Sequence, residues 1–292
     1  MLESIVVARG LSKYFGDRLV LEDVSCSVER GDIVGVLGKN AAGKTTLLEL
    51  MLGFTPPSAG RVEVYGQDSF RMTSAVKARI GFVPQQDELI NQLSVADQLR
   101  LIRSFYSNWD DALIDRLMTD WELERNERIK NLSVGQRQKL SILLALGHSP
   151  EFLVLDEPVA SLDPIARRRF LEQLVEISVD GNRAIVFSSH IVSDIERLAN
   201  KIWIIKGSRL HWSGDVDALR ESVLRLHIRA AGPLPGNLVI PNALSVQLMD
   251  RYATAVVHGW DDELGRIVTN ATGASLELEP LGLEEIFLEL HR

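Results

Sequence analysis

The sequence of 292 residues predicts an α/β fold with a mainly parallel core sheet covered by helices. Apolar runs typical of strands buried on both faces recur at residues 33–37, 152–155, 184–188 and 201–205. Helical periodicity separates several of these runs, as it does over residues 164–177. A glycine-rich segment follows the first run and an acidic pair follows the second, at the strand ends where open α/β sheets bind ligands.

The N-terminal part of the chain has a different pattern. Residues 2–8, 19–28 and 61–65 alternate apolar and polar side chains, which is typical of antiparallel strands. The segment LSKYFGDR between the first two reads as a turn that carries two aromatic residues. We therefore expect an N-terminal antiparallel β subdomain.

Residues 32–48, DIVGVLGKNAAGKTTLL, join the first buried strand to an apolar helix. Gly38, four residues, Gly43, Lys44 and Thr45 have the spacing of a P-loop. Small residues let successive backbone N–H groups surround phosphate oxygens, and the helix N-terminus favours the same anion. We expect Lys44 to reach the β- and γ-phosphates and the Thr45 hydroxyl to hold Mg²⁺. A chance glycine-rich turn is the alternative, but the flanking strand and helix favour a P-loop NTPase fold.

An acidic pair ends the second buried strand, in the sequence FLVLDE. Asp156 is placed to hold Mg²⁺, directly or through water, and Glu157 to orient and deprotonate a water that attacks the γ-phosphate. Alone, the pair equally describes an ordinary strand end with acidic residues. The P-loop earlier in the chain favours the catalytic interpretation.

Two further strand ends carry single polar residues. Gln85 follows IGFVP and is a candidate to touch Mg²⁺ or the attacking water. His190 follows AIVFSS and is a candidate to sense a γ-phosphate through a hydrogen bond. A lone histidine is more often structural, and a loop glutamine is usually only exposed, so neither residue indicates a site without its partners.

Between residues 86 and 147 the periodicity becomes helical, which predicts an inserted helical lobe. The last helix is expected from Ser133 to Gly147, and Ser133 with Gln136 fits a capping box. Gly135 in the first turn lowers the stability of this helix by ~1 kcal/mol relative to alanine. A glycine is nevertheless expected here if a phosphate must come close to the backbone. One chain cannot easily bring both this helix N-terminus and its own P-loop to the same γ-phosphate. A second copy that faces the first can bring its helix N-terminus to the γ-phosphate bound at the P-loop of the first.

Composition limits the classes of function. The net charge of −8 argues against nucleic acid as a general partner. The single cysteine, Cys26, excludes an internal disulfide and a multi-cysteine zinc site, and is expected to be a core thiol. The chain begins without a signal-peptide pattern, and no apolar stretch approaches the ~20 residues of a membrane span. We expect a soluble, cytoplasmic protein that works at a membrane only through another chain.

The C-terminal part, residues 218–292, has no catalytic motif. Around the turn-rich segment 230–237, short strands expected at 223–228, 253–257 and 275–278 and two possible helices predict a small α+β domain of unknown role. We therefore divide the chain into domains 1–217 and 218–292, and we hypothesise that the second provides a self-association or regulatory surface.

Together these segments resemble the nucleotide-binding subunit of an ABC transporter. Six motifs occur within residues 1–217 in the order and with the spacing of that family. They are GKNAAGKT, PQ at 84–85, LSVGQ, FLVLDEP, SLD at 161–163 and SSH. The resemblance implies an ATPase that dimerises around two MgATP and drives integral membrane permease subunits from the cytoplasmic face. If the dimer is a homodimer, both of its ATP sites are expected to be competent. The ending LGLEEIFLEL, 281–290, is similar to the tails of exporter ATPases, which implies export.

The resemblance also implies roles for individual residues. Phe15 resembles the aromatic that stacks on adenine, Gln85 the loop that senses the permease, and His190 the switch histidine. Asp163 resembles a contact across the dimer. The implied catalytic residues are Glu157, His190, Gln85 and Lys44. The implied Mg²⁺ ligands are Thr45, Gln85 and Asp156. The P-loop residues implied to bind ATP are Gly38, Lys39, Asn40, Ala41, Ala42, Gly43, Lys44, Thr45 and Thr46. The residues implied to contact ATP on the opposite subunit are Ser133, Gly135 and Gln136.

Three positions depart from the family's pattern. Lys39 stands where proline or serine is usual, Ala41 where glycine is frequent, and Val134 where glycine is usual. Ala41 is expected to be strained if its position needs a positive φ. Val134 adds a side chain beside the phosphate bound in trans and is expected to weaken dimer closure. None of the three removes a charged or metal-binding group.

Two other functions stay open. A non-transport ABC ATPase acting on nucleic acid or the ribosome is disfavoured by the single cassette, the acidic charge and the lack of long coiled coils or zinc modules. A regulatory member that binds ATP but hardly hydrolyses it is kept open by the three departures. The cargo, the direction of transport and the choice between homodimer and heterodimer are not determined by these residues.

Overall fold

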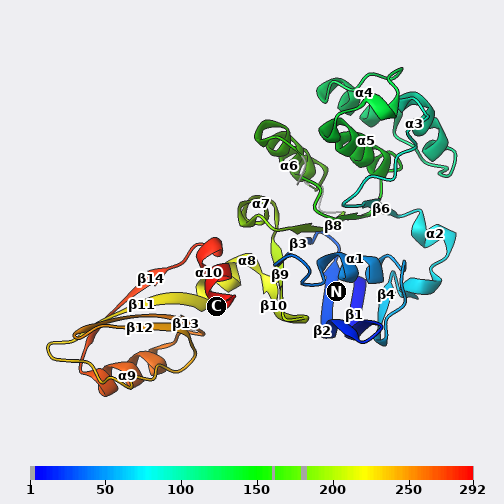
Figure 1. Cartoon of the computed structure of the whole chain (residues 1–292). Helices are drawn as coiled ribbons and strands as arrows, with labels where there is room; N and C mark the ends of the chain where they lie inside the picture. The colour runs from blue at the N-terminus through cyan, green and yellow to red at the C-terminus, as the bar shows by residue number, and fades with distance from the viewer. Residues whose placement is uncertain (1–3, 160–161, 179–182, 292) are drawn as a thin grey trace. The chain divides into compact units, whose positions relative to one another are not determined.

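The computed structural model describes residues 4–159, 162–178 and 183–291. The chain divides into two compact units, Met1–Ser213 and Gly214–Arg292 (Figure 1). The boundary placed after residue 217 by the sequence falls inside helix α8 (Val216–Ser222), which belongs to the second unit.

A six-stranded sheet forms the centre of the first unit. Its strands follow the order β10 (Arg209–Asp215), β9 (Lys201–Lys206), β3 (Ile33–Gly38), β8 (Ala184–Ser189), β7 (Phe152–Leu155) and β6 (Ile80–Val83). From β9 to β6 all neighbouring pairs are parallel. Every residue of β7 and β8 is buried, as their continuous apolar runs predict. Because these strands are parallel, their carboxyl ends lie at one edge.

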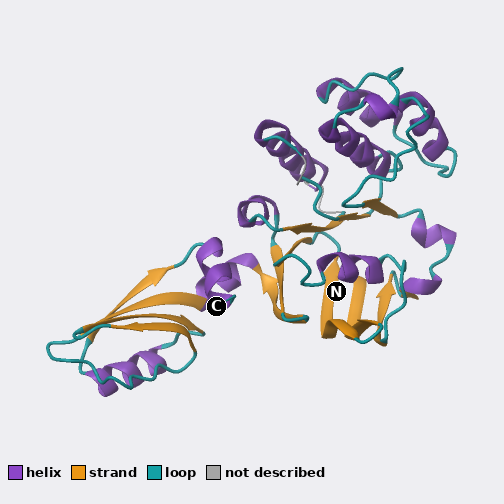
Figure 2. Cartoon of the chain, viewed as in Figure 1, coloured by secondary structure: helices purple, strands orange, loops and turns teal. Residues whose placement is uncertain are grey.

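A second, antiparallel sheet contains the N-terminal strands (Figure 2). Its order is β2 (Arg18–Glu29), β1 (Ser4–Phe15), β4 (Ala59–Val64) and β5 (Gln67–Asp68). Its apolar side shares one core with helix α1 (Lys44–Met51) and with residues of the parallel sheet. Cys26 lies in this core, where burial raises the pKa of its thiol to about 12. The N-terminal sheet therefore supports the helix that follows the P-loop.

The expected helical lobe contains α3 (Val95–Arg103), α4 (Asp111–Asp120), the 3₁₀ turn η2 (Ile129–Asn131) and α5 (Val134–Leu146). Each α-helix begins at a side-chain cap: Ser94, Asp110 and Ser133 accept hydrogen bonds from backbone N–H groups. The capping box expected at Ser133 is present, with Gln136 as the reciprocal partner. The other helices of this unit are η1 (Ser69–Arg71), α2 (Ser74–Lys77), α6 (Pro164–Ser178) and α7 (Val192–Leu198).

The second unit is α+β. Its antiparallel sheet has the order β12 (Ala243–Leu248), β13 (Tyr252–His258), β11 (Val223–Arg229) and β14 (Ser275–Pro280). Helix α9 (Asp262–Thr272) packs Leu264 and Val268 against the sheet, and α10 (Leu283–Leu290) ends the chain. Strand β12 was missed, because its short edge run follows closely on the turn-rich segment. The α/β fold class with its antiparallel subdomain, helical lobe and α+β appendage is confirmed.

Candidate functional site

Four segments far apart in the sequence meet at the carboxyl edge of the parallel sheet. Gly38 ends β3, Gln85 follows β6, Asp156 follows β7 and His190 follows β8. These strands are parallel neighbours in the sheet, so the residues that follow them lie at the same edge, where the strands end. This edge is where ligands bind in open α/β sheets.

The loop between β3 and α1 has a backbone that few residues tolerate. Gly43 has a φ of 105°, and a Cβ there would lie 2.8 Å from Leu21 Cδ2 and 2.9 Å from the Val20 carbonyl oxygen. Ala41 has a φ of 63°, in the left-handed region that costs an L-residue about 1–2 kcal/mol. The strain expected for Ala41 is therefore confirmed.

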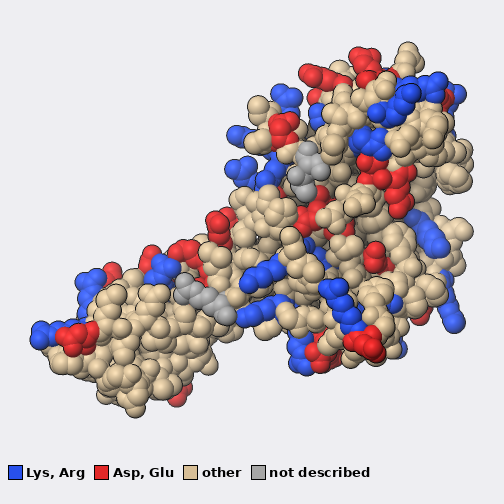
Figure 3. All heavy atoms as spheres, viewed as in Figure 1, with Lys and Arg blue, Asp and Glu red and all other residues tan. Residues whose placement is uncertain are grey.

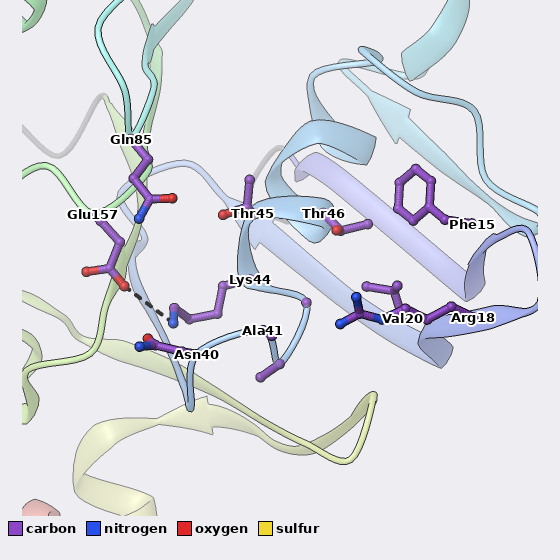
Figure 4. A pocket seen from close by; sticks show the side chains of 12 residues that line it. Phe15, Arg18, Val20, Asn40, Ala41, Lys44, Thr45, Thr46, Gln85 and Glu157 are labelled. Carbon is purple, nitrogen blue, oxygen red and sulfur yellow. Dashed lines mark ion pairs between the residues drawn. The ribbon is translucent and has the colours of Figure 1, made fainter.

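A cavity of about 320 Å³ opens beside this loop. Gln85 and Glu157 lie on one side of it and Phe15 and Arg18 on the other, with Lys44 between them (Figure 4). The sequence analysis named all the lining residues except Arg18 and Val20, which follow closely on Phe15. The cavity is lined by Phe15, Arg18, Val20, Asn40, Ala41, Ala42, Gly43, Lys44, Thr45, Thr46, Gln85 and Glu157.

Lys44 places a buried cation in the wall of this cavity. Its Nζ donates to the Gly38 carbonyl oxygen at 3.0 Å and lies 3.3 Å from Oε1 of Glu157. The two side chains are only 7% and 8% exposed, and a buried charge requires such partners. An ammonium group beside a ring of P-loop residues is the arrangement that binds phosphate oxygens.

The acidic pair after β7 is held by a serine of β8. Ser188 Oγ donates to Oδ1 of Asp156 at 2.6 Å and accepts a hydrogen bond from the Glu157 N–H at 2.8 Å. Ser188 is fully buried, and Glu157 has a φ of 48°. Backbone strain of this kind persists where the surroundings hold it in place. Ser188 was missed by the sequence analysis, which considered only the histidine of SSH.

His190 contacts the second oxygen of the same glutamate. Its Nδ1 lies 2.8 Å from Oε2 of Glu157, and its side chain is 51% exposed. Glu157 thus lies between the ammonium of Lys44 and the imidazole of His190. The lone histidine noted in the sequence therefore has a carboxylate partner in the structure.

The oxygen donors at this edge fit Mg²⁺. Asp156 supplies a buried carboxylate, while Thr45 and Gln85 supply a hydroxyl and an amide oxygen at the cavity. Mg²⁺ is bound through one or two carboxylates together with substrate phosphates and waters. In the described residues no group of three or more His, Cys, Asp or Glu side chains could hold a metal ion alone.

Several predicted residues lie outside this cavity in the described chain. Ser133 and Gln136 bond each other across the helix cap, and Val134 is 65% exposed. Asp163 accepts hydrogen bonds from two backbone N–H groups of α6, and these bonds, chiefly the one from Ala166, lower the pKa of its carboxyl. Neither Lys39 nor Gly135 lines the cavity, and Lys39 is exposed. Ser161 of the SLD segment lies outside the described residues.

The surface gives two further findings. Among the described helices, none is both long enough and apolar enough to cross a bilayer. On the face shown in Figure 3, basic and acidic side chains of the described residues lie among one another and form no continuous basic patch.

Comparison with known proteins relates the chain to ATP-binding proteins. A profile of the ABC transporter family matches residues 21–160. The Nod factor export ATP-binding protein I of Cupriavidus pinatubonensis is 35% identical over 214 residues, covering 71% of the chain and 65% of that protein. The protein of the same description from Rhizobium johnstonii is 31% identical over 291 residues, covering 96% and 93%. A solved ATP-binding subunit of an ABC transporter superposes with a TM-score of 0.68 at 28% identity, over 74% of the chain and 92% of that structure.

Proposed function

The chain belongs to the family of ABC transporter ATP-binding subunits, which hydrolyse ATP, and we propose that two copies close around two MgATP to drive separate permease subunits. The cavity at the P-loop is the first half of the proposed site. Its walls offer Phe15 for stacking on adenine and the backbone of residues 40–46 for the phosphates. Arg18, an exposed cation on the same wall, is added to the proposed binding residues.

The observation that carries the proposal is the position of Glu157 between Lys44 and His190. We propose Glu157 as the general base that takes a proton from the attacking water. A triphosphate would offer Lys44 stronger partners than the carboxylate. Lys44 would then leave Oε1 of Glu157 free for water, while His190 continues to orient Oε2.

Mg²⁺ would neutralise the charge that develops on the transferred phosphate when it is bound. We propose that Thr45, Gln85 and Asp156 hold it. In this arrangement Ser188 fixes the direction of the Asp156 carboxylate by donating a hydrogen bond to it.

The second half of the site is proposed to come from another copy. Ser133, Gly135 and Gln136 begin a helix of 13 residues whose N-terminus favours anions. They lie outside the cavity of their own chain, and so does Asp163. A homodimer that presents this helix end to the partner's ATP completes two equivalent sites.

The transport role rests on the relatives. Those described as Nod factor export proteins favour export for this chain. We propose that the chain lies on the inner face of the membrane, held there by permease subunits that supply the membrane-spanning segments. Residues 1–217 are proposed as the ATP-binding domain, and residues 218–292 as a domain for self-association or regulation.

A second candidate is a regulatory subunit with little turnover. Val134 and the strained Ala41 favour it, because both lie in segments proposed to bind phosphate. Phosphate release by the purified chain separates the two functions.

The test of the proposed function uses Glu157→Gln in the full chain. We expect loss of phosphate release, retention of ATP binding by calorimetry and an ATP-dependent dimer by analytical ultracentrifugation. Unchanged phosphate release would remove Glu157 from its role, and a variant that stays monomeric with saturating ATP would contradict the shared site.

A further inference from the structure

The guanidinium of Arg137 joins two segments to which the proposed function gives separate tasks. Arg137 directly follows the signature segment, residues 133–136, and Asp87 lies two residues beyond Gln85. Arg137 Nε donates to Oδ2 of Asp87 at 2.9 Å, and Nη2 donates to the other oxygen of the same carboxylate. The pair is therefore bidentate, which fixes orientation as well as distance.

The remaining donors of Arg137 extend this connection. Nη1 donates to Oδ1 of Asn91 at 2.8 Å and to the Ile129 carbonyl oxygen at 3.1 Å. One side chain thus holds the loop after β6 at two points and the turn before the signature segment at a third. A lysine carries the same charge but lacks the planar fork needed for all of these contacts.

The environment favours a strong pair. The side chains of Arg137 and Asp87 are 18% and 20% exposed, and partial exclusion of water strengthens charged hydrogen bonds. By contrast, Arg100 and Asp97 form a more exposed pair within a single turn of α3, with side chains 75% and 44% exposed.

We propose that Arg137 is a positioning residue that couples the Gln85 loop to the signature segment, so that a displacement of either one moves the other. This inference rests on the proposed function, which assigns Gln85 to Mg²⁺ and the helix end at residues 133–136 to the ATP of the partner copy. Arg137 acts through these residues and is not placed against ATP itself.

The test uses the full chain with Glu157→Gln, which keeps ATP intact during the measurement. We add Arg137→Met, Arg137→Lys or Asp87→Asn and measure two quantities. These are the ATP affinity of the monomer at low protein concentration and the ATP-dependent dimer affinity by analytical ultracentrifugation. Arg100→Met is the matched control, because it removes an ion pair of the same lobe that connects only neighbouring residues.

We expect Arg137→Met to weaken the dimer about tenfold, the effect of losing one charged hydrogen bond, with ATP affinity within about twofold of the parent. Arg137→Lys should retain part of the dimer affinity that Arg137→Met loses. The double variant Arg137→Met/Asp87→Asn should lose no more dimer affinity than the weaker-binding of the two single variants, because both substitutions remove the same contact. Arg100→Met should match the parent.

Three outcomes would overturn the inference. A dimer of Arg137→Met as tight as the parent would overturn it alone and leave the proposed function standing. Equal losses of monomer ATP affinity and dimer affinity would indicate a general structural role. If the Glu157→Gln parent itself fails to dimerise with ATP, that result would contradict the proposed function, and the coupling that depends on it would also be rejected.

Discussion

The Nδ1 atom of His190 lies 2.8 Å from Oε2 of Glu157. Because Lys44 lies 3.3 Å from Oε1, side chains of the protein itself orient both oxygens of this carboxylate. The backbone of Glu157 adds to this, since its φ of 48° places a non-glycine residue in the left-handed region. An oriented carboxylate beside a phosphate-binding lysine is suited to direct a water molecule.

The first prediction concerns His190→Ala. Removing the imidazole leaves Oε2 of Glu157 without its partner, and we expect phosphate release to fall by about 100-fold. ATP affinity should change by less than about threefold, because His190 does not line the cavity. Malachite green assays and calorimetry measure the two quantities. His258→Ala, an exposed histidine of β13, is the control, and full turnover in His190→Ala would remove the histidine from the mechanism.

The second prediction concerns Ser188→Ala. This hydroxyl donates to Asp156 and accepts from the Glu157 N–H, so its loss leaves two buried groups without a partner and should lower the free energy of unfolding by about 1–3 kcal/mol. Phosphate release should fall as well, and Ser188→Thr should restore both. Urea unfolding provides the stability value. Ser104→Ala, an exposed serine of the helical lobe, serves as control, and a Ser188→Ala protein as stable as this control would contradict the role.

Some parts of the structure follow from local patterns and others do not. The P-loop and the capping box at Ser133 depend on residues within a few positions of one another, so their spacing predicts them. Ser188 contacts the acidic pair only because β7 and β8 are neighbours in the sheet, although α6 separates them in sequence. Arg137 and Asp87 are 50 positions apart. Such contacts depend on tertiary packing, which periodicity in a single sequence does not describe.

The third prediction concerns Ala41→Gly. The present φ of 63° costs alanine about 1–2 kcal/mol, while glycine loses about 0.5–1 kcal/mol more chain entropy on folding. We therefore expect a net gain in the free energy of unfolding of about 0.5–1 kcal/mol. Ala42→Gly is the matched control. Ala42 has no positive φ and packs against the core, so its replacement should destabilise. Equal losses in both variants would show that Ala41 is not strained.

The last prediction concerns how the contribution of the Glu151 ion pairs to stability depends on pH. Two hydrogen bonds from Arg79 are the main cause that lowers the pKa of this carboxyl below its ordinary value of 4.5, burial opposes them, and Arg30 adds a third bond. A lowered pKa means that the pair stabilises the fold above pH ~4.5 and loses this contribution as pH falls through the folded-state value. Glu151→Gln should therefore cost about 1 kcal/mol or less at pH 7, because the side chain is 38% exposed. The difference from the parent should shrink as the pH falls from 7 towards 3, because Glu151 takes up a proton as the pH passes through its folded-state pKa. Urea unfolding at both pH values measures this, with the exposed Glu124→Gln as control, and a difference that does not depend on pH would show that the ion pair does not contribute.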